Sequence, residues 1–104
     1  QDVALSVKEL HRIKEIGLAG IQIGSNINDI NLSEEMFFPI WKTCQELGLA
    51  IMVHPWNMMG FEQIKKYWLP WLVGMPAETA RAAASMIFAG VFDKYPDLRV
   101  MFSH

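Results

Sequence analysis

An alternation of helix and strand occurs three times along the chain, and it restricts the possible folds more than any other feature of the sequence. Apolar residues recur at helical spacing in three segments, predicted as helices at residues 3–16, from near Pro39, and at residues 76–91. Each segment leads into a short continuous apolar run, predicted as a strand at residues 19–23, 49–53 and 98–102. This rhythm indicates an α/β protein with a parallel sheet covered on its outer face.

Several residues are predicted to bound these elements. Gly17 and Gly48 follow the first and second helices, where glycine allows the left-handed conformation that often ends a helix. Asn31 and Ser33 are candidate N-caps in the polar loop before the second helix, and Pro39 suits its first turn. We therefore expect three separate helix–strand units, with their strands parallel and adjacent in chain order. Both a doubly wound sheet and a β/α barrel fit this pattern.

The apolar positions of the helices predict which side chains are buried. The second helix carries Phe37, Ile40, Trp41, Cys44 and Leu47 on one face, and the third carries Ala80, Ala83, Ala84, Ile87 and Val91. We interpret Cys44 as a small core residue. It is the only cysteine, so no intrachain disulfide forms, which fits a reducing compartment.

Composition and charge exclude some functions. The formal net charge is −2, so the chain has no basic surplus to neutralise phosphates, and we expect no nucleic-acid binding. The longest apolar run, residues 82–92, is shorter than the ~18 residues expected of a membrane span, and the N-terminus has no signal-peptide pattern. We therefore expect a cytoplasmic protein. The chain begins at Gln1 and stops after the third predicted strand, so we expect a piece of a larger protein.

Two of the three histidines lie where parallel β/α proteins place their active sites, at the carboxyl ends of strands. His54 closes the second predicted strand and His104 closes the third, whereas His11 lies in the middle of the first predicted helix. Imidazole is a common ligand of divalent metals and exchanges protons near neutral pH. The pair is therefore either a metal or acid–base site, or two strand-end histidines whose nitrogens are satisfied by the backbone.

A segment rich in tryptophan follows His54. Trp56, Trp68 and Trp71 all fall between the second strand and the third helix, and three indoles are costly to leave in water. The segment either packs on itself or on another subunit over the mouth of the fold, or it forms a lid whose aromatic faces hold a flat, conjugated substrate.

The residues of these segments resemble the aminocarboxymuconate-semialdehyde decarboxylase family of the amidohydrolase superfamily. The resemblance rests on His-Pro-Trp at residues 54–56, on the run Lys-Tyr-Trp-Leu-Pro-Trp-Leu-Val-Gly-Met-Pro-Ala-Glu-Thr at residues 66–79, and on residues 20–24 and 90–104. It implies that residues 1–104 are a partial amidohydrolase-type barrel domain, about the middle third of an enzyme. The fold would be three consecutive helix–strand units of a (β/α)8 TIM-type barrel.

The resemblance also implies roles for individual residues. His54 would be a zinc ligand, His104 the catalytic acid–base group, and Trp71 and Met58 substrate-binding residues. The remaining zinc ligands of the family lie outside this chain. The implied activity is the zinc-dependent, non-oxidative decarboxylation of aminocarboxymuconate semialdehyde, a small molecule of tryptophan breakdown by the kynurenine pathway, by a homodimeric enzyme. The isolated segment would be inactive.

Two alternatives stay open. One is another member of the superfamily, either a benzoate-type decarboxylase or a metal-dependent hydrolase, and in several hydrolases the histidine equivalent to His104 is itself a metal ligand. The other is a barrel-derived module without catalytic activity, whose tryptophan segment binds a partner.

Overall fold

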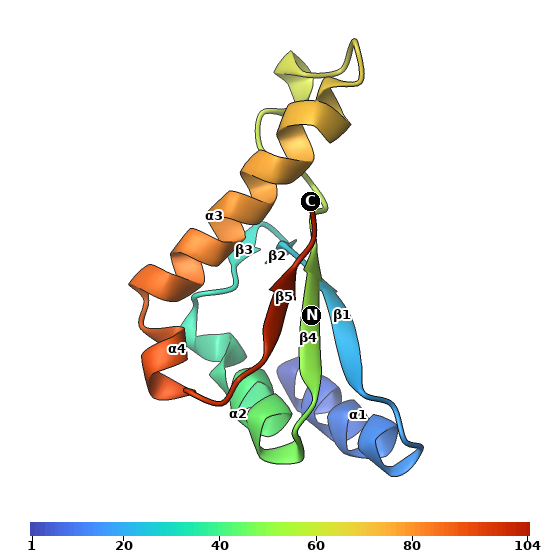
Figure 1. Ribbon diagram of the computed structural model, residues 1–104, viewed down its shortest axis with the longest axis vertical. Helices are drawn as coiled ribbons and strands as arrows, with labels where there is room; N and C mark the ends of the chain where they lie inside the picture. The colour runs from blue at the N-terminus through green and yellow to red at the C-terminus, as the bar shows by residue number, and fades with distance from the viewer.

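The computed structural model describes residues 1–104 and contains a three-stranded parallel sheet (Figure 1). The strands are β1 (Gly20–Gly24), β4 (Ala50–His54) and β5 (Val100–Phe102), adjacent in that order. β1 pairs with β4 along its whole length, and Ile51 to Val53 pair with Val100 to Phe102. The prediction of three parallel strands, adjacent in chain order, is confirmed.

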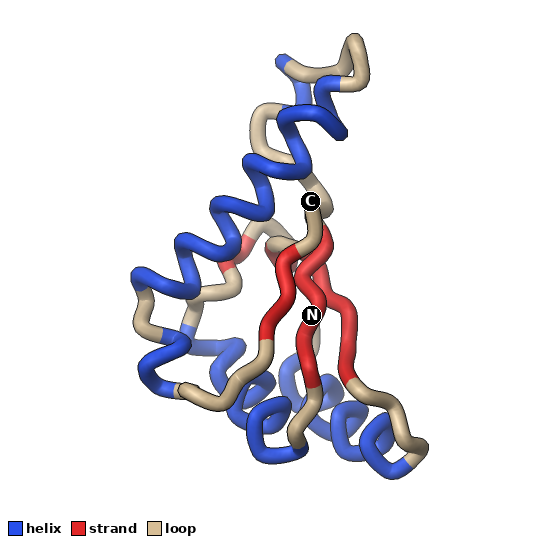
Figure 2. The backbone as a smooth tube through the Cα atoms, in the orientation of Figure 1, coloured by secondary structure: helices blue, strands red, loops and turns tan.

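Helices lead into each of these strands (Figure 2). They are α1 (Val3–Glu15), α2 (Phe38–Leu47), α3 (Met75–Phe88) and the short α4 (Val91–Lys94). Asp2 caps α1 by accepting a hydrogen bond from the Leu5 N–H at 2.9 Å. Gly17 and Gly48 have φ of 86° and 63°, so both predicted helix ends are confirmed. No helix in the structure has the length and apolar character needed to cross a lipid bilayer.

The predicted N-caps of the second helix are wrong. Asn31 lies in a two-residue strand, β3 (Ile30–Asn31), which pairs antiparallel with β2 (Asn26–Ile27). A 3-10 turn, η1 (Glu35–Phe37), then leads into α2, and neither turn nor helix has a side-chain cap. The hairpin holds Asn31 four residues before η1, and proline in the first turn of α2 has no N–H to satisfy.

The third predicted helix is two helices. Gly90, with φ of 70°, separates α3 from α4. The predicted buried face is also wrong in part, because Ala80 and Ile87 are exposed, while the buried residues are Met75, Glu78, Thr79, Ala82 and Met86. An alanine-rich helix is weakly apolar on all sides, so spacing alone does not identify the face that packs.

The two faces of the sheet differ. Ile51 and Val53 of the central strand are buried in a core formed with the helices. On the opposite face the register places Gln22, Met52 and Met101 side by side, and Gln22 and Met101 are exposed. The helices therefore cover one face only, as for the wall of a barrel whose interior lies on the other side.

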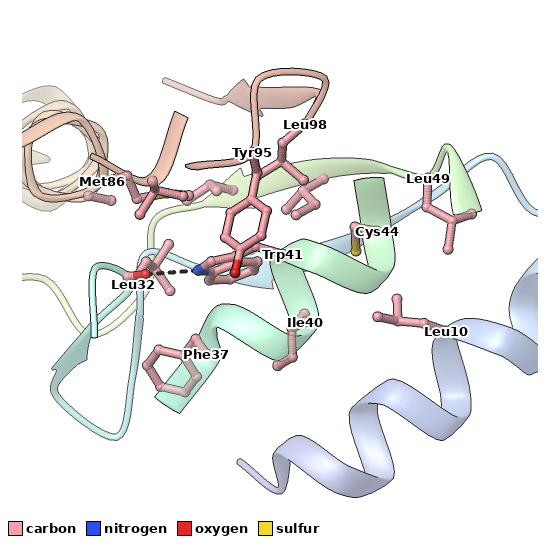
Figure 3. Close-up of a cluster of buried hydrophobic side chains, with 14 of the residues drawn as sticks. Leu10, Leu32, Phe37, Ile40, Trp41, Cys44, Leu49, Met86, Tyr95 and Leu98 are labelled. Atoms are coloured by element: carbon pink, nitrogen blue, oxygen red, sulfur yellow. Dashed lines mark hydrogen bonds between the residues drawn. The ribbon is translucent and has the colours of Figure 1, made fainter. Parts of the chain in front are cut away.

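The core is centred on α2. Trp41 is fully buried, and its indole Nε1 donates a hydrogen bond of 3.2 Å to the Leu32 carbonyl oxygen (Figure 3). Cys44 is buried, as predicted, and burial raises the pKa of its thiol to about 12. A neutral, enclosed thiol is unreactive, so Cys44 is a packing residue.

The isolated 104-residue chain is expected to have low stability. Its radius of gyration is 14.3 Å, against about 13 Å for a compact domain of this length. β1 and β5 leave open sheet edges, and Leu5, Ile16 and Phe88 are exposed. We expect no cooperative monomeric transition when the isolated chain is heated and followed by circular dichroism. A sharp transition from a monomer at all concentrations would contradict this expectation.

Candidate metal and catalytic site

The two strand-end histidines lie together. His54 is the last residue of β4, and His104 follows β5 by two residues. Their ring centroids are 5.1 Å apart, with the planes perpendicular. Ser103 links the residues before His104 to β4, since its N–H and its hydroxyl both donate hydrogen bonds to the Val53 carbonyl oxygen, at 3.0 and 3.1 Å. The juxtaposition expected from the sequence is therefore present.

The surroundings of His54 fit a metal ligand. Its Nδ1 lies 3.1 Å from the carbonyl oxygen of Pro55. A carbonyl only accepts hydrogen bonds, so this contact places the proton on Nδ1 and leaves the Nε2 lone pair free for a metal. No group of three or more His, Cys, Asp or Glu side chains in the chain is arranged to hold a metal ion. Imidazole nitrogens are suitable ligands for zinc or manganese, but two histidines alone are too few to make a metal site.

A polar pocket opens beside His54. It is lined by Trp56, whose side chain is largely exposed, and by five carboxamide residues, which are Gln1, Gln22, Asn26, Asn28 and Asn57. The sequence analysis predicted none of these five as site residues. Gln22 offered a signal, because it is the single polar residue inside an apolar strand. The pocket can hydrogen-bond a polar substrate while one aromatic face lies at its side.

The tryptophan segment, residues 55–74, extends past the carboxyl ends of the strands (Figure 1, yellow). It contains a 3-10 turn, η2 (Phe61–Gln63), and a π-helical turn, η3 (Pro70–Gly74). Trp71 in η3 is about half exposed and packs on Trp68, with 4.9 Å between ring centroids.

Met58 is half-buried inside the same segment. A Cβ built on Gly74 would lie 2.9 Å from its sulfur, so glycine at position 74 lets the π-helical turn pack closely over Met58. Neither Met58 nor Trp71 lines the pocket that contains His54. The structure therefore brings the two predicted site histidines together but does not place these two predicted substrate-binding residues beside them.

A buried carboxylate, Glu78, lies behind the site. Its side chain in the first turn of α3 has no exposed surface. Oε1 accepts hydrogen bonds from Ser25 Oγ at 3.0 Å and Asn26 Nδ2 at 2.9 Å, and Oε2 accepts from the Met59 N–H at 3.1 Å. Arg81 Nη2 donates to Oε1 as well. A glutamate in the first turn of a helix ordinarily favours the helix start through its negative charge, so its position in the sequence does not mark it as buried.

Comparison with known proteins defines the class. The family model described as Amidohydrolase matches residues 1–104. The 2-amino-3-carboxymuconate-6-semialdehyde decarboxylase of Dictyostelium discoideum is 56% identical over 100 residues, covering 95% of this chain and 28% of that protein. The chain thus spans less than a third of the length of this relative.

Solved structures of related decarboxylases have the same fold. A 5-carboxyvanillate decarboxylase of Sphingomonas paucimobilis superposes with a TM-score of 0.91 at 29% identity, covering 100% of this chain and 32% of that one. The enzyme of the same activity from Novosphingobium aromaticivorans, complexed with manganese, gives a TM-score of 0.74 at 31% identity, covering 100% of this chain and 31% of that one. The fold is three consecutive units of a (β/α)8 barrel, as predicted.

The chain belongs to the amidohydrolase family. Within it, the chain groups with the metal-dependent decarboxylases, and the similarity to 2-amino-3-carboxymuconate-6-semialdehyde decarboxylases confirms the resemblance inferred from the tryptophan-rich run.

Glu78 makes stability depend on pH. Burial raises the pKa of its carboxyl, but the hydrogen bonds from Arg81, Met59, Asn26 and Ser25 outweigh burial and hold the pKa below its ordinary value of 4.5. A carboxylate with a lowered pKa stabilises the fold above pH 4.5, and this contribution is lost as the pH falls through the lowered value.

In the full-length protein, Glu78→Gln is expected to lower the free energy of unfolding at pH 7 by about 2 kcal/mol, because charge-assisted hydrogen bonds to a buried group are lost. The difference from wild type should shrink below pH 4.5. Urea titrations at pH 7 and in acid measure both values. A difference that stays constant into acid would contradict the assignment of a buried, ionised Glu78.

Proposed function

We propose that this chain is the middle part of the barrel domain of a zinc-dependent enzyme that decarboxylates 2-amino-3-carboxymuconate-6-semialdehyde. The observation that carries the proposal is the contact of His54 and His104 at the ends of neighbouring strands, with ring centroids 5.1 Å apart. The substrate class follows from the relative with 56% identity, whose name gives that activity.

His54 is proposed to bind the metal through Nε2, since Nδ1 is engaged by the Pro55 carbonyl. When bound, the metal supplies Lewis-acid stabilisation of developing negative charge. Zinc is the proposed metal, and manganese is the competitor because a related decarboxylase was solved with it. The other ligands would come from parts of the barrel outside these residues.

His104 is proposed as the catalytic acid–base group. When the C–C bond to the carboxyl breaks, carbon dioxide departs, and the electron pair left on carbon must take up a proton. An imidazole holds and releases protons near neutral pH, and His104 lies beside the proposed metal ligand. No organic cofactor is needed for this balance.

The tryptophan segment is proposed to bind the substrate. Trp71 and Met58 lie in the segment beyond the strand ends, and Trp56 and the carboxamides line the pocket of His54. A flat conjugated substrate gains from an aromatic face, and its polar groups match amide donors and acceptors. We further propose that the full-length protein is a cytoplasmic homodimer of tryptophan catabolism by the kynurenine pathway.

A second candidate is a benzoate-type decarboxylase. It is favoured by the superposition on a 5-carboxyvanillate decarboxylase over the entire chain, with a TM-score of 0.91. The two candidates share the metal and the histidines and differ only in the substrate.

The test is a metal analysis and substrate comparison on the purified full-length protein. We expect bound zinc and release of carbon dioxide from 2-amino-3-carboxymuconate-6-semialdehyde, with slower release from 5-carboxyvanillate and dihydroxybenzoates. Faster turnover of the benzoates would favour the second candidate. A protein that binds neither zinc nor manganese and releases no carbon dioxide would be the non-catalytic module instead.

A further inference from the structure

The loops that follow β1 and β4 meet at one buried carboxylate. Ser25 and Asn26 come directly after β1, and Met59 lies in the segment after β4. All three donate hydrogen bonds to Glu78, at 2.9 to 3.1 Å. Glu78 is the fourth residue of α3, so its hydrogen bonds also link the start of this helix to the two loops.

The same loops are also joined to each other. Asn26 Nδ2 donates a hydrogen bond to the Trp56 carbonyl oxygen at 3.0 Å, and Ser25 Oγ accepts one from the Trp56 N–H at 3.2 Å. The carboxylate therefore fixes the two side chains that hold Trp56 in place. Trp56 is two residues after His54 and lines the same pocket.

The residue after Glu78 acts on the third strand. Thr79 Oγ1 donates to the Ser103 carbonyl oxygen at 2.8 Å, directly before His104. Two consecutive residues in the first turn of α3 thus contact the segments that carry both site histidines. Because α3 packs on the core through Ala82 and Met86, this turn has a rigid base.

We propose that Glu78 is a positioning residue, which sets where the substrate-binding segment at Trp56 to Met59 lies relative to His54. The proposal rests on the proposed function for its effect on catalysis, but the contacts themselves are independent of that function. Glu78 touches neither His54 nor the pocket, so it acts through Asn26, Trp56 and Met59.

The chemistry of the position favours a carboxylate. Four donors converge on Glu78, from Ser25, Asn26, the Met59 backbone and Arg81. A carboxylate is acceptor-only, whereas glutamine would turn an NH₂ group toward one of these donors. Since the side chain has no exposed surface, water cannot replace the lost acceptor.

The experiment compares Glu78→Gln and Glu78→Asp with Glu9→Gln in the full-length protein. Glu9 is a matched control, because it also pairs with an arginine three positions later, Arg12, but is exposed on α1 and does not line the pocket of His54. Hydrogen exchange is followed at the Met59 amide and at the Ile51 and Val53 amides of β4. Steady-state kinetics and metal content are measured on the same samples.

For Glu78→Gln we expect exchange at the Met59 amide to rise roughly tenfold or more beyond any rise at the β4 amides, which reports only the lower global stability, while the metal stays bound. KM should rise more than kcat falls, because substrate contacts move while the histidines remain. Glu78→Asp, which keeps the charge, should restore part of the protection and part of KM, and Glu9→Gln should match wild type.

Equal loss of protection at Met59, Ile51 and Val53 would overturn the proposal, because Glu78 would then only support the fold as a whole. Unchanged exchange at Met59 or an unchanged KM would overturn it as well. If the wild-type protein lacks the proposed activity, the proposed function fails and the kinetic comparison no longer applies. The exchange result at the Met59 amide still decides whether Glu78 positions this segment.

Discussion

His54→Ala in the full-length protein is expected to lose bound metal and turnover together, whereas His104→Ala is expected to keep most of the metal. The reason is the assigned division of roles. The Nε2 of His54 is free to bind metal because the Pro55 carbonyl engages Nδ1, and His104 stands 5.1 Å away, centroid to centroid, as the proton-exchanging group. Loss of an acid–base group lowers turnover by roughly 10²–10⁴-fold, and we expect that range for His104→Ala.

The measurement is metal per subunit beside the decarboxylation rate for each variant. His11→Ala is the control, because His11 is exposed on α1 and away from the site, and it should leave both values unchanged. If His104→Ala empties the site as fully as His54→Ala, then His104 is a ligand and the hydrolase-like alternative gains support. If neither variant changes metal or rate, both histidines are structural and the proposed function fails.

Gly20→Ala is expected to give the largest loss of stability of any single methyl addition in this chain. A Cβ built on Gly20 would overlap the carbonyl oxygen of Ala50 and lie 2.9 Å from its carbonyl carbon. The clashing atoms are backbone atoms of Ala50 in the paired strand β4, so they cannot rotate away as a side chain can. The clash is relieved only if β1 and β4 separate at the point where their pairing begins. Overpacking costs about 1–3 kcal/mol and occasionally more, and we expect at least ~3 kcal/mol here.

Urea unfolding of the full-length protein measures this loss, with Gly17→Ala as the matched control. Gly17 has φ of 86°, but an added methyl group would meet nothing within 4 Å, so its substitution should cost only the ~1–2 kcal/mol of a left-handed residue. A Gly20→Ala protein as stable as the Gly17→Ala protein would show that the strands do not approach as closely as described.

Short-range chemistry in the sequence determined most of the framework. The apolar runs that follow Gly17 and Gly48 predicted two of the buried strands. The parallel order followed because each intervening helix carries the chain back to the end of the sheet where the next strand begins. Strand-end positions alone were enough to predict that His54 and His104 meet, since the carboxyl ends of adjacent parallel strands lie at one edge.

Periodicity failed where the local signal was weak. On α3 it selected Ala80 and Ile87, because alanine gives little contrast between faces, and only packing against the core showed which side is buried. It also missed the β2–β3 hairpin, whose strands are too short to show an alternating pattern.

Only the tertiary structure decided what Glu78 and Trp56 do. Three of the four donors to Glu78 lie 53, 52 and 19 residues away in sequence, so no local pattern marks the residue as buried. An exposed glutamate in the first turn of a helix, paired with a basic residue one turn later, is the ordinary expectation. Trp56 lines the pocket of His54 and Trp71 does not, because the hydrogen bonds of Trp56 with Ser25 and Asn26 hold one end of the segment against the strands. A sequence records which donors and acceptors exist, but a buried charge is stable only where the fold brings enough of them together.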